Sequence, residues 1–164
     1  MQHILDLAHS VNDEYGGRNI FETAENSGAN VWYRFLGGLK GFYMCELGKR
    51  YIIINNSFDK MTQTVVCAHE LGHDMLHREL SAEGIRDNTL FLAGNKTERE
   101  ANIFAAEMLI SDEEILSEME YCQTLESISY ALGYMPEIVA YKLEILNYLG
   151  YRFNLSEVGS DFLK

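Results

Sequence analysis

The chain is poor in basic residues and has no long hydrophobic run. Its 164 residues include 13 Lys and Arg against 25 Asp and Glu, and the net charge of −12 removes the general attraction to nucleic acid phosphates or anionic lipid. No run approaches the roughly 18 to 20 apolar residues of a membrane span, and the N-terminus "MQHILDLAHS" lacks the basic start of a signal peptide. We therefore expect a cytoplasmic protein with no direct binding to nucleic acid or membranes.

Cysteine is also scarce. Cys45, Cys67 and Cys122 lie far apart and form no CxxC pair, which fits reduced thiols in a cytosolic protein better than a disulfide framework. The composition is 47% hydrophobic and 12% aromatic, which is enough to form a hydrophobic core. A chain of 164 residues is too short for two comfortable domains, each with its own core. We predict a single domain over residues 1–164.

The first third of the chain predicts helices followed by strands. Residues 2–15 carry apolar side chains at helical spacing, and a short helix is expected within "NIFETAEN". Between residues 31 and 56, the runs "VWYRFL", "FYMCEL" and "YIIINN" are separated by glycine-containing turns. This pattern predicts a three-stranded antiparallel meander, and with the helices an α+β fold.

Helical periodicity returns after residue 57 and dominates the rest of the chain. It is interrupted at residues 78–96, where the irregular pattern could hold a short strand at "TLFLAG" or act as a lid. Residues 111–164 are expected to form a C-terminal helical bundle, with a capping box at Ser111 and a helix that begins at Pro136.

The segment "CAHELGHDMLH", residues 67–77, contains the pattern HExxH. Residues four apart lie on one face of a helix, so His69 and His73 can both reach one zinc ion. Glu70 lies about 100° around the helix, where its carboxylate can accept a proton from water. A chance polar stripe is the alternative, but neighbouring apolar residues place the histidines beside a buried face. The pattern predicts a catalytic zinc site on a zincin-type helix.

A catalytic zinc usually has three protein ligands, so a third residue is needed. The extended pattern HExxHxxGxxH requires glycine at position 76 and histidine at 79, where this chain has Leu76 and Glu79. His77 lies one further helical turn from His73, about 6 Å away, which makes it a residue that packs or hydrogen-bonds beside the site.

Glu98 is the strongest candidate for the third ligand. It falls inside the apolar arc of its expected helix, whereas Glu100 and Glu107 fall on the opposite side. A buried carboxylate needs a partner, either zinc or an inward-facing salt bridge. Asn102 lies one turn later on the same side and could hydrogen-bond a ligand.

The segment HELGHxxLH after three strands, followed by "TEREANIFAAEMLI", resembles the ImmA/IrrE family of metallopeptidases, specifically compact ImmA-like proteins of phages and integrative elements. The resemblance implies that His69, His73 and Glu98 bind zinc and that Glu70 is the catalytic base. It also implies cleavage of a helix-turn-helix repressor encoded nearby, which relieves repression. The sheet edge that binds substrate stays open, as does a side-chain oxyanion donor among Tyr43, Tyr51, Tyr121 and His77.

The sequence allows two other functions. The stretch "LESISYALGYMPEIVAYKLEIL" has a helix-turn-helix pattern, but residues 111–164 hold ten acidic and three basic residues, which argues against DNA binding. The second is a zinc-stabilised antirepressor that sequesters a regulator without cutting it. A structural zinc usually has a fourth protein ligand, most often Cys. Cys67 points about 160° away from His69, which favours the peptidase.

Overall fold

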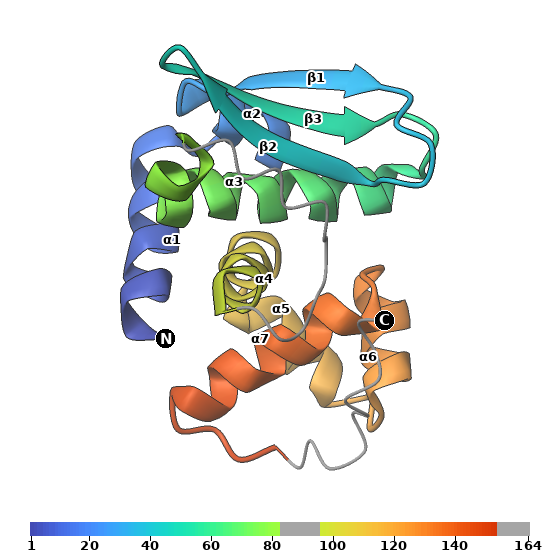
Figure 1. Ribbon diagram of the computed structural model, residues 1–164. Helices are drawn as coiled ribbons and strands as arrows, with labels where there is room; N and C mark the ends of the chain where they lie inside the picture. The colour runs from blue at the N-terminus through green and yellow to red at the C-terminus, as the bar shows by residue number, and fades with distance from the viewer. Residues whose placement is uncertain (83–95, 154–164) are drawn as a thin grey trace.

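The computed structural model describes residues 1–82 and 96–153 (Figure 1). Within these ranges the helices and strands follow one another as α1 (Gln2–Tyr15), α2 (Ile20–Asn26), β1 (Asn30–Arg34), β2 (Gly41–Glu46), β3 (Lys49–Asn55), α3 (Lys60–Ala82), α4 (Lys96–Leu109), α5 (Asp112–Met119), α6 (Leu125–Leu132) and α7 (Pro136–Tyr148). The predicted α+β composition is therefore confirmed. None of the helices in this part of the chain is long and apolar enough to cross a membrane.

The sheet is mixed, and the predicted antiparallel meander is wrong. The strand order is β1-β3-β2, with β1 parallel and β2 antiparallel to the central β3. Residues 35–40 carry the chain from β1 past the position of β3 to the far side of the sheet. Six residues can extend to about 20 Å, and two strand spacings need only about 10 Å. The connection is thus long enough to leave room for β3 between its neighbours.

Several helix ends follow local signals in the sequence. Helix α1 ends before Gly16, as the spacing predicts. Ser111 and Glu114 form the expected capping box at the start of α5, and α7 begins at Pro136. These signals act within one helical turn, which is why they could be identified without knowledge of the fold.

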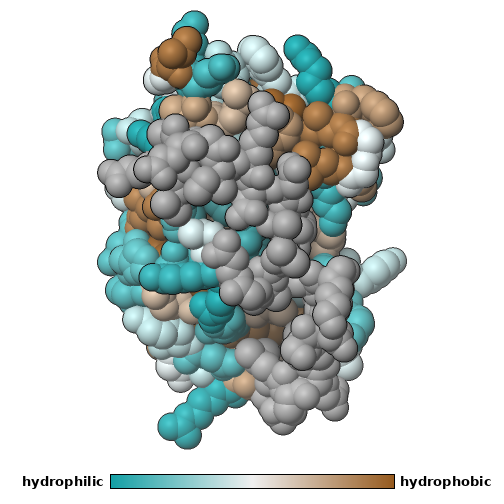
Figure 2. Space-filling model, viewed as in Figure 1, coloured by the Kyte–Doolittle hydropathy of each residue, from teal (hydrophilic) through white to brown (hydrophobic). Residues whose placement is uncertain are grey.

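The elements form layers around α3. The sheet covers one side of α3, whereas α4 and the C-terminal helices lie on the other side (Figure 1). Ile52 and Ile54 of β3 point inward and join the main hydrophobic core. Trp32 is 46% exposed and lies next to Ile53 in the register, on the face turned away from α3. Figure 2 shows hydrophobic atoms gathered over the sheet side of the molecule.

Close contact between α3 and α4 depends on Gly72. A Cβ added at this position would lie 3.1 Å from Ala101 Cα and 3.2 Å from the Ala101 carbonyl oxygen. The glycine therefore allows the two backbones to approach and brings the first turn of α4 next to the HExxH segment.

Part of the stretch predicted to be irregular, residues 78–96, is helical. Helix α3 continues to Ala82 after a break in helical geometry at His77, and α4 begins at Lys96. The possible strand at "TLFLAG" lies outside the described residues.

Candidate metal centre

Helix α3 brings two imidazoles together. His69 and His73 are one turn apart, their ring centroids are 4.7 Å apart, and the planes are nearly perpendicular. The two Nε2 atoms are 3.0 Å from each other. His69 is fully buried and His73 is partly buried, so both nitrogens are largely shielded from solvent.

Glu98 reaches the same point from the first turn of α4. Its Oε2 atom lies 3.2 Å from His69 Nε2, and its Oε1 atom lies 3.2 Å from His73 Nε2. Burial by itself raises the pKa of Glu98, but the two imidazoles outweigh it and hold the pKa well below its ordinary value. The Glu98 carboxylate is therefore held in its charged form between the two imidazoles.

These three residues fit a metal ion. Their ligand atoms all lie within 4.8 Å of one another. Ligand atoms about 2.0 to 2.1 Å from a tetrahedral zinc would be about 3.3 Å apart, close to the spacing of the nitrogens and oxygens found here. Glu98 Oε2 is buried and receives no hydrogen bond from the described residues. A cation would satisfy this atom and both nitrogen lone pairs.

Asn102 orients the first imidazole. Its Oδ1 atom lies 2.9 Å from His69 Nδ1, and an amide oxygen can only accept a hydrogen bond. His69 therefore carries its proton on Nδ1 and presents the lone pair of Nε2 to the metal position. Hydrogen bonds of this kind are what usually fix the ring orientation of metal-binding histidines.

Glu70 lies next to the group without belonging to it. The residue is 3% exposed, and burial raises the pKa of its carboxyl to about 7. A charge on His73 and the backbone N–H of Tyr43 lower this pKa, whereas the charge of Glu98 raises it. The carboxyl is therefore held in a site where both of its protonation states are accessible near neutral pH.

Comparison with known proteins identifies the family. A family model described as the IrrE N-terminal-like domain matches residues 21–144, which is most of the chain. The chain belongs to the ImmA/IrrE family. It is 32% identical over 130 residues to a protein named uncharacterized immunity region protein 2 of Bacillus phage phi105, covering 79% of this chain and 82% of that one. It is also 24% identical over 157 residues to metallopeptidase ImmA of Bacillus subtilis (strain 168), covering 96% and 86%.

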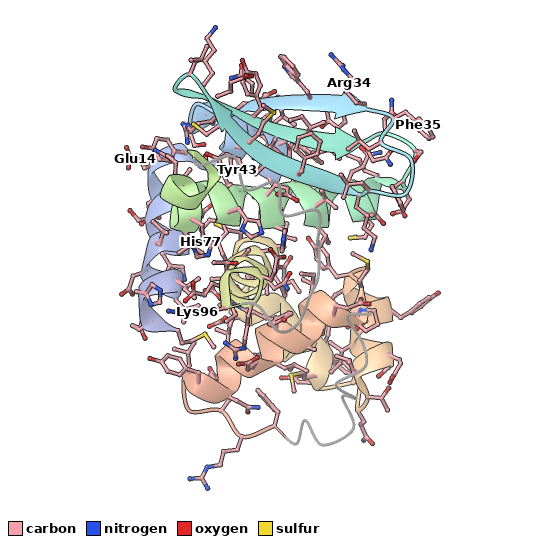
Figure 3. All side chains as sticks on the ribbon, viewed as in Figure 1. Glu14, Arg34, Phe35, Tyr43, His77 and Lys96 are labelled. Atoms are coloured by element: carbon pink, nitrogen blue, oxygen red, sulfur yellow. The ribbon has the colours of Figure 1, made fainter. Side chains whose placement is uncertain are left out.

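Membership of this metallopeptidase family agrees with a metal at His69, His73 and Glu98. His77, the third histidine of the segment 67–77, lies outside this group. Its Nε2 atom is 3.5 Å from Glu100 Oε2, and its ring centroid is 5.8 Å from that of His73. In Figure 3, His77 lies on the side of α3 that faces α4. Burial, and then the charge of His73, lower the pKa of His77.

The tyrosines considered as oxyanion donors in this ImmA/IrrE chain lie in different environments. Tyr51 packs against Trp32, with ring centroids 4.8 Å apart, on the outer face of the sheet. Tyr121 is 82% exposed in the turn after α5. Tyr43 lies between the sheet and α3 (Figure 3), and burial and the nearby Asp74 raise its pKa far above the ordinary value. Its hydroxyl is buried and has no hydrogen-bond partner among the described residues.

Two contacts near the site involve residues that the sequence analysis did not single out. Asp74, next to His73, is fully buried and binds Arg50 of β3 at 2.5 Å and Arg78 at 3.1 Å. Tyr141 of α7 accepts a hydrogen bond from Asn102. The contacts of Asp74 with Arg50 and of Asn102 with Tyr141 join segments far apart in the chain, which no local spacing indicates, whereas Asp74 and Arg78 lie four residues apart on α3.

Proposed function

We propose that this protein is a zinc-dependent endopeptidase that cleaves a helix-turn-helix repressor of a phage or mobile element and thereby relieves repression. The observation that carries the proposal is the convergence of His69, His73 and Glu98, with Glu70 beside them. The names of the relatives, an immunity region protein and a metallopeptidase, support it.

The residues divide the chemistry between them. When bound by His69, His73 and Glu98, zinc supplies a Lewis acid that activates water and polarises the scissile carbonyl. Glu70 accepts a proton on its carboxylate and delivers it to the leaving amine. Asn102 keeps the lone pair of His69 Nε2 directed at the metal position. Burial of Glu70 and Glu98 excludes bulk water, which strengthens these electrostatic interactions.

The open edge of β2 is the better candidate for substrate binding. In the described part of the chain, β2 pairs with β3 on one side only. The backbone N–H of Tyr43, in the middle of β2, lies close enough to Glu70 to influence its pKa. The outer edge of β1 lies two strands away, roughly 10 Å further from Glu70. An extended peptide that pairs with β2 would therefore pass next to the catalytic carboxylate.

The direct test compares the wild type with Glu70→Gln on a candidate helix-turn-helix repressor. Both zinc-loaded proteins are incubated with the purified repressor, and the intact repressor is measured over time. We expect the wild type to cleave it and Glu70→Gln to be slower by about 10²- to 10⁴-fold, the usual contribution of a general base. Glu113→Gln, an exposed change on α5, is the matched control and should cleave normally.

Equal loss of intact repressor with the wild type and Glu70→Gln would refute the catalytic role. Zinc-loaded wild type that binds the repressor stably but never cuts it would instead support an antirepressor that acts by sequestration.

A further inference from the structure

A chain of hydrogen bonds leads from the metal site to the C-terminal helices. His69 Nδ1–H donates to Asn102 Oδ1 at 2.9 Å, and Asn102 Nδ2–H donates to the hydroxyl of Tyr141 at 3.4 Å. The three residues come from α3, α4 and α7, so the chain crosses three helices. Tyr141 lies 39 residues from Asn102 in sequence.

Asn102 depends on both contacts. The residue is 1% exposed, so its amide cannot turn to water for partners. Its Oδ1 atom is occupied by His69, and the Tyr141 hydroxyl is the one acceptor that the described residues offer to its Nδ2 group. A buried donor without an acceptor is costly, so removal of the hydroxyl would penalise the amide orientation that His69 requires.

We propose that Tyr141 is a positioning residue for the metal centre, which acts through Asn102 to hold His69 in the orientation that binds zinc. The inference rests on the proposed zinc site. Tyr141 is linked to the site by its hydrogen bond from Asn102, which binds the Nδ1 side of the His69 ring, whereas the metal position lies on the Nε2 side. We therefore expect its effect to pass through the orientation of the imidazole.

Because Tyr141 lies on α7, the packing of the C-terminal helices would affect metal binding. Helix α7 packs against α4, and Ile138, Leu143, Ile145 and Leu146 anchor α7 in the core. The hydroxyl of Tyr141 is therefore held at a fixed distance from Asn102 by the packing of a helix that contributes no ligand. Displacement of α7 would release Asn102 and loosen His69.

The test measures zinc affinity, by competition with a chromophoric chelator, for the wild-type chain and four variants. Tyr141→Phe keeps the ring and removes only the hydroxyl. Partners that bind a ligand directly change metal affinity by about 10- to 100-fold, so we expect that loss for Asn102→Ala. For Tyr141→Phe, one bond further away, we expect a loss of about 3- to 10-fold.

The double variant and a matched control separate positioning from general damage. Because Tyr141 acts through Asn102, the double variant Asn102→Ala/Tyr141→Phe should bind zinc no more weakly than Asn102→Ala alone. Tyr134→Phe removes another partly buried hydroxyl, which donates to the Leu109 carbonyl of α4 at 3.1 Å. It should leave zinc affinity unchanged.

Three results would overturn the inference: unchanged zinc affinity in Tyr141→Phe, an equal loss in Tyr134→Phe, or additive losses in the double variant. If the wild type bound no zinc, the proposed function and this inference would both fall. If the wild type bound zinc but cut no repressor, only the peptidase proposal would fall, and the affinities would still decide the role of Tyr141.

Discussion

The Nε2 atoms of His69 and His73 point at each other across 3.0 Å. His69 carries its proton on Nδ1, because Asn102 accepts a hydrogen bond there. Its Nε2 lone pair therefore faces both the second imidazole and the Glu98 carboxylate, 3.2 Å away. A cation at this point would satisfy all three groups at once.

Zinc should stabilise the folded protein. The metal binds a site that exists only when α3 and α4 are packed together, so a free zinc concentration of 100 times the Kd adds about 2.7 kcal/mol to the free energy of unfolding. For a protein of this size, that gain raises the Tm by roughly 5 to 10 °C. Thermal unfolding of chelator-treated protein with and without added zinc measures the effect. An unchanged Tm with saturating zinc would contradict it.

Glu98→Gln should weaken zinc binding more than a change at any residue other than the three ligands His69, His73 and Glu98. It removes a ligand, whereas groups that only support ligands change metal affinity by about 10- to 100-fold. Glu100→Gln, two residues further along α4, lies outside the ligand group and is the matched control. Chelator competition gives both affinities. Similar affinities for the two variants would mean that Glu98 forms an inward salt bridge instead of binding metal.

Gly72→Val should damage both stability and metal binding. The added side chain meets the Ala101 backbone and Phe104, so α4 must move away from α3 and carry Glu98 with it. Overpacking of this kind costs about 1 to 3 kcal/mol. Urea unfolding and zinc competition should both show a loss. Gly38→Val, where an added Cβ meets nothing within 4 Å, should show neither. Wild-type zinc affinity in Gly72→Val would refute the link between helix packing and the site.

Lys142→Met should lower the free energy of unfolding, although Lys142 is not one of the proposed metal ligands. The Lys142 side chain is 1% exposed and binds Glu107 at 2.7 Å and Asp112 at 2.6 Å. Removal of one partner from a buried ion pair typically costs about 3 to 5 kcal/mol, because Glu107 is left with much of its charge buried. Urea unfolding measures the loss, and the double variant Lys142→Met/Glu107→Gln should recover part of it. A loss below about 1 kcal/mol would contradict this reading.

Features set by local spacing could be predicted from the sequence. The spacing of four residues places His69 and His73 on one face of a helix, and the apolar arc of the next helix indicates that Glu98 points inward. Both positions agree with the geometry observed here. These inferences need only the geometry of one helix at a time.

Features set by packing between distant segments could not be predicted. The strand runs in the sequence indicate that three strands exist, but they do not say which strands are neighbours, and β3 lies in the middle. Helical phase places Glu107 opposite the apolar arc of α4, yet its side chain is only 7% exposed, because α1 and α7 also pack against α4. Tyr141 was missed for the same reason, since its contact with Asn102 joins α4 to α7.

The most direct test of the account is the zinc K-edge X-ray absorption spectrum of the zinc-loaded protein. His69, His73 and Glu98 predict one zinc per chain with nitrogen and oxygen neighbours at about 2.0 to 2.2 Å and no sulfur at about 2.3 Å. A sulfur neighbour would place Cys45, Cys67 or Cys122 at the metal. Less than one zinc ion per chain, with a spectrum of loosely bound zinc, would show that these residues do not form a metal centre. Either result would contradict the central claim.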